Sequence, residues 1–340
     1  MRHTFYIPFV LIFMAISSIV HAFEPFQPLP SMPPIPDDNP LTASKISLGK
    51  MLFFDRRLSV NGSLSCNSCH DLSRAGSDYR VLSPGATGHS NQRSTPTLYN
   101  VAYQTVFYWD GRASTLEEAI ASHLLDRTIM SIPTTTDVVN VINKVPAYRK
   151  LFSEVFQSSI SYDTITAALA SFVRSLTTPN SPWDNYLNGN KSAISKQARI
   201  GFKTFIETGC ASCHFWVNLS GPVPGLAFQQ GEGFYELFPN YPGTDYERRY
   251  LLSDDLGRYA ITKDPTDRRM WRVPVLRNIE LTAPYFHNGS VATLEEAIKV
   301  MAKVQLGKDM VQPDVDDVAV FLRTLTGKIP DITVPQLPYM

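Results

Sequence analysis

Two copies of one five-residue motif, Cys-x-x-Cys-His, constrain this chain more than any other feature, because together they use all four of its cysteines. The copies occupy residues 66–70 and 210–214. In such a motif both thiols add to the vinyl groups of a haem, and the histidine that follows binds the iron as an axial ligand. The sequence therefore predicts two covalently bound c-type haems, attached through Cys66, Cys69, Cys210 and Cys213 and ligated by His70 and His214.

Paired cysteines have three other common uses in proteins. A single copy is compatible with a redox-active dithiol, and cysteines of an exported chain often form a disulfide framework. A zinc site requires the two pairs to converge on one ion. None of these explains why histidine completes both copies, and a chain of 340 residues has little need of disulfides for stability. We therefore favour the two haems.

The N-terminus has the pattern of an export signal. A basic start precedes an apolar run over 5–20, and the Val-His-Ala sequence at 20–22 resembles a small-residue cleavage site. We predict a signal peptide over 1–22, a mature start at Phe23 and a periplasmic location. An uncleaved anchor is the alternative. Because the run is near the lower length limit for a membrane span and lacks a basic flank, we expect no span after signal removal.

Proline placement and length divide the rest of the chain. Residues 23–40 are rich in proline and predict an extended arm, because proline prevents helix formation. A chain of 340 residues suits two domains of about 100–200 residues each. The Pro-Asn-Ser-Pro segment at 179–182 gives a boundary. We therefore expect an N-terminal haem domain over 41–180 and a C-terminal haem domain over 181–340.

Apolar residues at helical spacing predict a mainly helical chain. Leu48, Leu52 and Phe53 follow the candidate caps Thr42 and Ser44, and this helix leads into the first haem motif. Similar stripes recur before the second motif and towards the end of each domain, at Phe202, Phe205 and Ile206, at Ile165, Leu169, Phe172, Val173 and Leu176, and at Val318, Phe321, Leu322 and Leu325. Strand signals are short and scattered. We expect two cytochrome c-like domains of helices and long loops with little strand.

An internal repeat relates the two halves. Residues 109–120 align without gaps on residues 287–298, and both segments contain Thr-Leu-Glu-Glu-Ala-Ile, a strong helix start. Thr115 and Thr293 are the expected N-caps. Two unrelated helices that merely begin alike are the alternative, but the upstream haem motifs match as well, which favours a duplication.

The order of the motifs resembles the bacterial dihaem cytochrome c peroxidase and MauG superfamily over nearly the whole chain after the signal. Besides the two haem motifs, the likeness is carried by Leu-Phe-Phe-Asp at 52–55, Arg-Ser-Thr-Pro-Thr at 93–97, Tyr-Trp-Asp-Gly-Arg at 108–112, Val-Pro-Val-Leu-Arg-Asn at 273–278 and Pro-Tyr-Phe-His-Asn-Gly-Ser at 284–290. The resemblance implies that the N-terminal haem is the site of peroxide chemistry. It implies that the C-terminal haem receives electrons and has a methionine as sixth ligand.

The resemblance also assigns roles to single residues. Met301 stands at the place of the family's methionine ligand, with Met270 as its competitor. A thioether ligand raises the potential of a haem, which suits an electron entry point. Trp109 matches the tryptophan that lies between the two haems. Thr282 and Pro284 match positions whose carbonyl groups bind Ca2+ between the domains, but the family's asparagine is replaced here, at Ser94.

The expected function is that of a periplasmic cytochrome c peroxidase, an oxidoreductase that reduces hydrogen peroxide to water. Its electrons come from a small c-type cytochrome or a cupredoxin and pass from the C-terminal haem through Trp109. A homodimer is implied by the resemblance only. The charges are balanced, with 31 Lys plus Arg and 31 Asp plus Glu, so no nucleic-acid partner is indicated.

Two other functions stay open. One is a MauG-like enzyme that oxidises residues of a partner protein; that relative has tyrosine where Met301 stands, so Met301 favours the peroxidase. The other is an electron-transfer protein with two six-coordinate haems and no peroxidase activity.

The sequence departs from the family beside the first haem. Members of the family usually place a glutamine and a glutamate there, and counting from Trp109 those places hold Ala119 and Ile129. Neither side chain can move a proton, which cleavage of the O–O bond requires. The departure puts peroxidase activity in doubt unless another residue substitutes.

His123 is the candidate substitute. It lies as far past Trp109 as Met301 lies past His287, so the duplicated scaffold directs it at the first iron, where the family usually has proline. We hypothesise that His123 is either the sixth ligand of the first haem or its distal acid and base. His89, in the loop at 85–89, is a rival, and an ordinary exposed or core histidine is the remaining alternative.

Overall fold

The computed structural model describes residues 25–225 and 229–339. The predicted signal peptide and the mature start at Phe23 lie outside the described residues. Within the described part of the chain, no helix is both long enough and apolar enough to cross a membrane.

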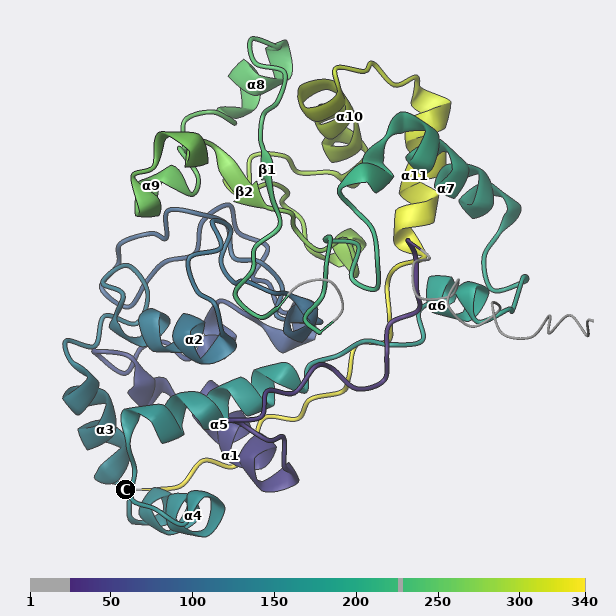
Figure 1. The fold of residues 1–340 in the computed structure, drawn as a ribbon. Coiled ribbons are helices and arrows are strands. Elements are labelled where there is room, and N and C mark those ends of the chain that lie inside the picture. Colours follow the sequence, from purple (N-terminus) through teal and green to yellow (C-terminus); the bar gives the residue numbers. More distant parts are fainter. Residues whose placement is uncertain (1–24, 226–228, 340) are drawn as a thin grey trace, which may run out of the picture.

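The chain is mainly helical, as predicted, with one two-stranded antiparallel sheet (Figure 1). The helices of the first half are α1 (Ala43–Phe54), α2 (Leu116–Leu125), α3 (Thr135–Asn143), α4 (Pro146–Phe156) and α5 (Tyr162–Arg174). Those of the second half are α6 (Pro182–Leu187), α7 (Lys196–Thr208), α8 (Asp245–Tyr250), α9 (Tyr259–Thr262), α10 (Leu294–Leu306) and α11 (Gln312–Arg323). The strands are β1 (Tyr235–Leu237) and β2 (Met270–Arg272), with Glu236 opposite Trp271.

Side-chain caps fix where the main helices begin. Of the two candidates before α1, Thr42 is the cap, and its hydroxyl accepts from the backbone N–H of Lys45. Thr115 and Thr293 cap α2 and α10 in the same way, as the repeat predicted. These caps are local features, which is why the sequence alone located them.

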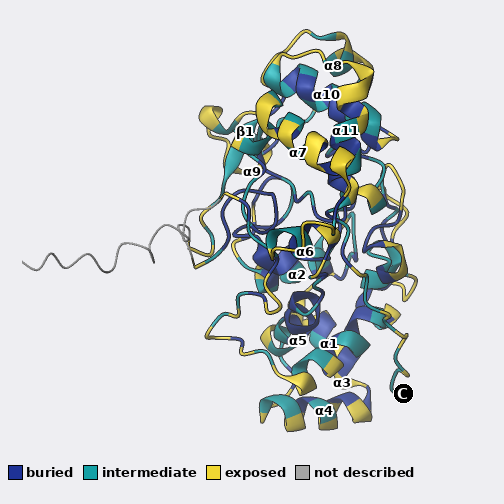
Figure 2. Ribbon diagram, turned by 90° about the vertical axis from the view of Figure 1, so that its right-hand side faces the viewer, coloured by how far each residue is buried: buried dark blue, intermediate teal, exposed yellow. Residues whose placement is uncertain are grey.

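The described residues form two large hydrophobic cores and one small cluster made of Leu29, Tyr103, Val217 and Val223. The first is built from α1 to α5 and extends from Leu48 to Leu176, and the second joins α6, α7, α10 and α11 from Trp183 to Leu325. Figure 2 shows the buried faces of these helices turned inward. The division at residue 180 stays a prediction, since Ile329 and Ile332 pack against the first core and Trp109 packs against the second.

In each half a glycine brings the haem-motif helix against the last long helix. A Cβ atom on Gly49 of α1 would lie 1.9 Å from the carbonyl oxygen of Ala168 in α5. A Cβ atom on Gly201 of α7 would lie 1.8 Å from the carbonyl oxygen of Asp317 in α11. No side chain fits at either crossing, so the two halves share one packing solution.

The loops before α2 and α10 repeat each other as well. Asn100 and Asn278 both adopt left-handed backbone conformations, with φ of 64° and 59°. Isolated bridges join Phe107 to Ala113 in the first half and Tyr285 to Val291 in the second. The duplication that the sequence repeat indicated therefore extends to the backbone of both halves.

The proline-rich segment is extended and packs on both halves instead of extending away from them. The hydroxyl of Tyr103 donates to the carbonyl of Pro30 at 2.6 Å, and the N–H of Leu29 donates to Asp184 at 2.9 Å. Phe26 and Leu29 are buried. The arm thus links the first half, through Tyr103, to the second half, through Asp184.

We predict that Gly49→Ala destabilises the protein by about 2 kcal/mol, because the added methyl group forces α1 away from α5. Ser47→Ala is the matched control, since it adds helix propensity at an exposed position of the same helix. Denaturant unfolding of both variants checks this. Equal midpoints for the two variants would contradict the close-packed crossing.

Candidate functional site

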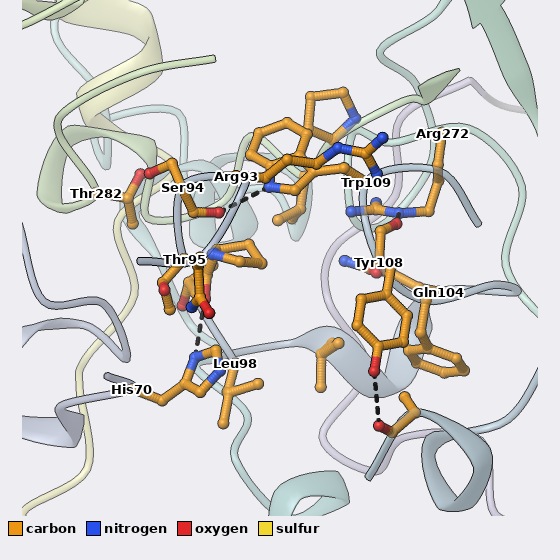
Figure 3. Close-up of a pocket in the computed structure, with 18 of the residues that line it drawn as sticks. His70, Arg93, Ser94, Thr95, Leu98, Gln104, Tyr108, Trp109, Arg272 and Thr282 are labelled. Atoms are coloured by element: carbon orange, nitrogen blue, oxygen red, sulfur yellow. Dashed lines mark hydrogen bonds between the residues drawn. The ribbon is translucent and has the colours of Figure 1, made fainter. Parts of the chain in front are cut away.

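One cavity of about 680 Å3 extends between the two halves and reaches both haem motifs. Its wall contains Cys66, Cys69 and His70 from the first motif and Cys210 and His214 from the second. Most of the remaining lining is apolar, from α2, α5 and α10 and from the loops that precede them. Figure 3 shows the part around His70 and Trp109.

Both haem motifs form the same short turn. The turns η3 (Cys66–Ser68) and η6 (Cys210–Ser212) place two cysteines and a histidine on one turn of backbone. The N–H of His70 donates to the carbonyl of Cys66 at 2.9 Å, and that of His214 donates to the carbonyl of Cys210 at 3.0 Å. The two attachment sites are therefore geometrically equivalent.

The state of the thiols argues against the alternatives to haem. Burial raises the pKa of Cys66 to about 12 and that of Cys210 to about 11, so neither is the thiolate that a redox dithiol needs. All four cysteines are free thiols, without a disulfide. Cys66 packs against the first core and Cys210 against the second, so the pairs do not converge as a zinc site requires.

The two motif histidines have the tautomer and the neutral charge that a metal ligand needs. Nδ1 of His70 lies 3.1 Å from the carbonyl oxygen of Pro96, and Nδ1 of His214 lies 2.8 Å from that of Leu219. A carbonyl can only accept, so Nδ1 carries the proton and Nε2 keeps its lone pair. Burial lowers the pKa of each ring to about 4, which keeps both neutral. These residues fit an axial ligand of haem.

His123, on α2, faces His70 across the cavity. The two ring centroids are 6.4 Å apart, and the ring planes are inclined by 56°. Nδ1 of His123 lies 2.7 Å from the carbonyl oxygen of Ala119, so this ring also directs its Nε2 away from the helix backbone. Burial lowers the pKa of His123 as well. The structure brings together His70, which the haem motif related to the first iron, and His123, which the duplication related to it.

The other residues considered beside the first haem have different places. Ala119 and Ile129 line the cavity, so apolar side chains stand where the family's glutamine and glutamate are expected. His89 is exposed, with its Nδ1 3.0 Å from the hydroxyl of Thr87, and it is not part of the cavity wall.

Trp109 lies where the two halves meet. Its indole N–H donates to the carbonyl of Ser94 at 2.9 Å, and its own carbonyl accepts from the N–H of Arg272 at 3.0 Å (Figure 3). Although it precedes the proposed boundary, its ring packs against the second core. Trp109 therefore contacts both halves of the cavity.

The remaining predicted site residues divide between the cavity wall and the fold. Met301, on α10, lines the cavity, whereas its competitor Met270 lies in β2 away from the lining. Thr282, Pro284 and Ser94 all line the cavity, at the junction of the halves. Which ion or ligand these groups bind stays a prediction.

Sequence reasoning missed the arginines that surround Trp109. Arg93 donates to Asp110 at 2.5 Å and to Asp255 at 2.7 Å, and so joins the two halves. Arg272 is buried and pairs with no carboxylate among the described residues, and burial lowers its pKa to about 10. Arg93 begins the Arg-Ser-Thr-Pro-Thr motif and Arg272 directly precedes the Val-Pro-Val-Leu-Arg-Asn motif. Their contacts with Asp255 and with the carbonyl of Tyr108 join residues more than 160 positions apart, which no local pattern indicates.

Comparison with known proteins places these features in context. Residues 43–192 match a family model described as di-haem cytochrome c peroxidase, and residues 271–305 match one described as RoxA-like, cytochrome c-like. The chain is 37% identical to the cytochrome c551 peroxidase of Nitrosomonas europaea over 95% of this chain and 90% of that protein. It is 33% identical to the methylamine utilization protein MauG of Methylophilus methylotrophus, over 91% and 90% respectively.

A solved structure has the same fold. It is a MauG-like protein associated with microbial copper homeostasis, with a TM-score of 0.75 and 31% sequence identity. The match covers 87% of this chain and 93% of that chain.

We predict that Asp255→Asn destabilises the protein by about 1–2 kcal/mol at pH 7, because Arg93 loses a charged partner. Although burial alone would raise the pKa of Asp255, its hydrogen bonds and ion pair with Arg93 lower it. The stabilisation is therefore present above the unfolded pKa of about 3.9 and lost as the pH falls through the folded pKa.

Unfolding of wild type and Asp255→Asn at several pH values checks this expectation. The difference between them should shrink below about pH 4. Asp254→Asn, at the exposed neighbouring position, is the control. A difference that is constant between pH 3 and pH 7 would be inconsistent with the ion pair.

Proposed function

Because the chain belongs to the di-haem cytochrome c peroxidase family, we propose that it is a periplasmic cytochrome c peroxidase that reduces hydrogen peroxide to water. Cytochrome c peroxidases are its homologues over most of its length. The proposed electron donor is a small c-type cytochrome or a cupredoxin. The division into haem domains at residue 180 is part of the proposal.

The residues of both motifs would hold the haems. Cys66 and Cys69 would carry the thioether bonds of the first, with His70 as axial ligand; Cys210, Cys213 and His214 would do the same for the second. When bound, the haems supply iron for the reduction of peroxide and for the uptake of electrons. The lined cavity, the equivalent turns and the neutral imidazoles support this assignment.

The opposition of His70 and His123 is the observation that carries the detailed proposal. Metal–imidazole bonds are about 2 Å long, so two rings that bind one metal from opposite sides have centroids about 6 Å apart. The centroids here are 6.4 Å apart. A peroxide between metal and base would add at least one hydrogen-bond length of about 2.8 Å. We therefore propose that His123 would hold the first iron together with His70.

Peroxide chemistry would need the imidazole of His123 to be free, because a ring that holds a metal has no lone pair left for a proton. A free His123 could accept and return a proton, which Ala119 and Ile129 cannot do. His123 thus has a role in both of the states that the sequence left open, as ligand when bound and as acid and base when free.

The rest of the cavity is assigned to electron delivery. Met301 is the proposed sixth ligand of the second haem, and Trp109 carries electrons between the halves, consistent with its contacts to both. We propose Ca2+ for the carbonyl groups of Thr282 and Pro284, beside Ser94. Ca2+ binds oxygen ligands such as backbone carbonyl groups, so the ion would tie these loops together where the halves join.

A second function is favoured by the same observation about His123. If His123 held the first iron permanently, no free base would remain beside it, and the protein would transfer electrons without reducing peroxide. A MauG-like activity has less support, because Met301 stands where that relative has tyrosine.

Peroxide-dependent oxidation of reduced cytochrome c tests the proposed function. The half-reduced dihaem protein should oxidise the donor with peroxide. The Trp109→Phe variant should react more slowly, and its mass should show that both haems are still attached. Peroxide consumption without donor oxidation would favour the MauG-like activity. No reaction with peroxide would favour pure electron transfer.

Electron paramagnetic resonance tests the ligand assignment. The first haem is expected to have the lower potential, because its proposed ligands are imidazoles and not a thioether. We expect His123→Ala to convert the low-spin signal of this low-potential haem to a high-spin signal, because alanine cannot coordinate iron. His89→Ala should leave the signal unchanged, since His89 lies outside the cavity wall. An unchanged signal in His123→Ala would remove His123 from the coordination sphere.

A further inference from the structure

Tyr108 contacts His123 directly, which no sequence motif predicted. Its hydroxyl oxygen lies 2.6 Å from Nδ1 of His123, and the two rings stack with centroids 4.8 Å apart and planes 14° from parallel. The same hydroxyl lies 3.0 Å from the carbonyl oxygen of Ala119 and is also hydrogen-bonded to Ser122. Figure 3 shows the ring of Tyr108 on the cavity wall with its hydroxyl in a hydrogen bond.

The donors and acceptors of this cluster can be assigned. The carbonyl of Ala119 accepts only, so Nδ1 of His123 carries a proton and donates it. The hydroxyl of Tyr108 therefore cannot donate to Nδ1 and faces it as an acceptor. Its own proton goes to Ser122 or to the carbonyl of Ala119. Two acceptors, one carbonyl and one phenol oxygen, thus converge on a single imidazole N–H.

Tyr108 is itself held firmly. The guanidinium of Arg112 lies 3.7 Å from the centroid of its ring, and Arg112 is paired with the buried Asp110 at 3.1 Å. Nε of Arg272 donates to the carbonyl of Tyr108 at 3.0 Å. The backbone of Tyr108 is left-handed, with φ of 68°, which is costly for an aromatic residue. The fold thus fixes the ring at this place.

The duplication gives an independent comparison. In the second half, Phe286 stands at the place of Tyr108, with φ of 69°, and Met301 stands at the place of His123. A thioether has no N–H that could use an acceptor. The hydroxyl is therefore present in the half whose opposing residue is an imidazole and missing in the half whose opposing residue is a methionine. A purely structural aromatic would have no reason to follow this difference.

We propose that Tyr108 is a positioning residue that orients His123 and strengthens it as a ligand of the first iron. This inference rests on the proposed role of His123 as that ligand. An acceptor on the far nitrogen fixes the tautomer of a metal-bound histidine and raises its basicity. A more basic ligand stabilises the oxidised iron and lowers its reduction potential. Tyr108 thereby favours the state in which His70 and His123 both hold the iron.

The chain offers a matched control at Tyr162. The hydroxyl of Tyr162 donates to the carbonyl of Ala121, also on α2, at 2.5 Å. Both phenols therefore anchor the backbone of the same helix, at carbonyls two residues apart. Of the two, only Tyr108 stacks on His123 and bonds to its Nδ1. Tyr108→Phe and Tyr162→Phe remove one hydroxyl each and differ in this contact.

The test is the midpoint potential and the paramagnetic resonance spectrum of the low-potential haem in the purified dihaem protein. Tyr108→Phe should raise the midpoint potential by at least about 28 mV. This corresponds to a threefold change in the one-electron equilibrium constant, at 59 mV per tenfold. Its g values should shift as well. Tyr162→Phe should match wild type in both. Ser122→Ala, at an exposed position, should give a smaller shift in the same direction as Tyr108→Phe.

The outcomes separate the inference from the proposed function. If His123→Ala abolishes the low-spin signal but Tyr108→Phe changes the potential no more than Tyr162→Phe does, the role of Tyr108 is wrong and the ligand assignment stands. If His123→Ala leaves the signal unchanged, both are overturned. Should Tyr108→Phe fail to incorporate two haems, the Ser122→Ala potential decides, and an unshifted value would reject the proposal.

Discussion

The hydrogen bond from Nδ1 of a histidine to a main-chain carbonyl is the interaction on which the site depends. It recurs at His70, His214 and His123, with partners at Pro96, Leu219 and Ala119. In each case the bond selects one tautomer and directs Nε2 into or across the cavity. The carbonyls belong to loops and to α2, so the positions of the three imidazoles depend on those backbones.

The backbones are placed by two equivalent helix crossings. Gly49 lets α1 approach α5, and Gly201 lets α7 approach α11, so each haem motif starts from the same position relative to its last long helix. On this shared scaffold the side chains have diverged. Tyr108 and His123 in the first half correspond to Phe286 and Met301 in the second, which provides an imidazole on one side and a thioether on the other. If these side chains serve as haem ligands, as proposed, they would give the two haems different potentials.

The junction of the halves sets how Trp109 is held between them. Arg93 links Asp110 to Asp255, and the proline-rich arm bridges Tyr103 and Asp184. Asp184 is also paired with the fully buried Arg277 at 2.7 Å. Breaking one partner of such a buried pair leaves an uncompensated charge, so these contacts resist separation of the halves. The position of Trp109, and with it the proposed electron path, therefore depends on contacts distributed over the whole junction.

The sequence by itself determined the features that depend on neighbouring residues. Two Cys-x-x-Cys-His motifs, the caps at Thr115 and Thr293 and the amphipathic stripes each fit within one turn or one helix, so their pattern is complete in the printed order of residues. The repeat also related His123 to Met301. Tertiary structure decided what those residues meet. It placed the rings of His70 and His123 6.4 Å apart, the phenol of Tyr108 beside Nδ1 of His123, and Arg93 beside Asp255. Some of these contacts join segments that are distant in sequence. Others depend on how two nearby segments are oriented toward each other. Such contacts follow from helix crossings and loop backbones, which no local spacing specifies.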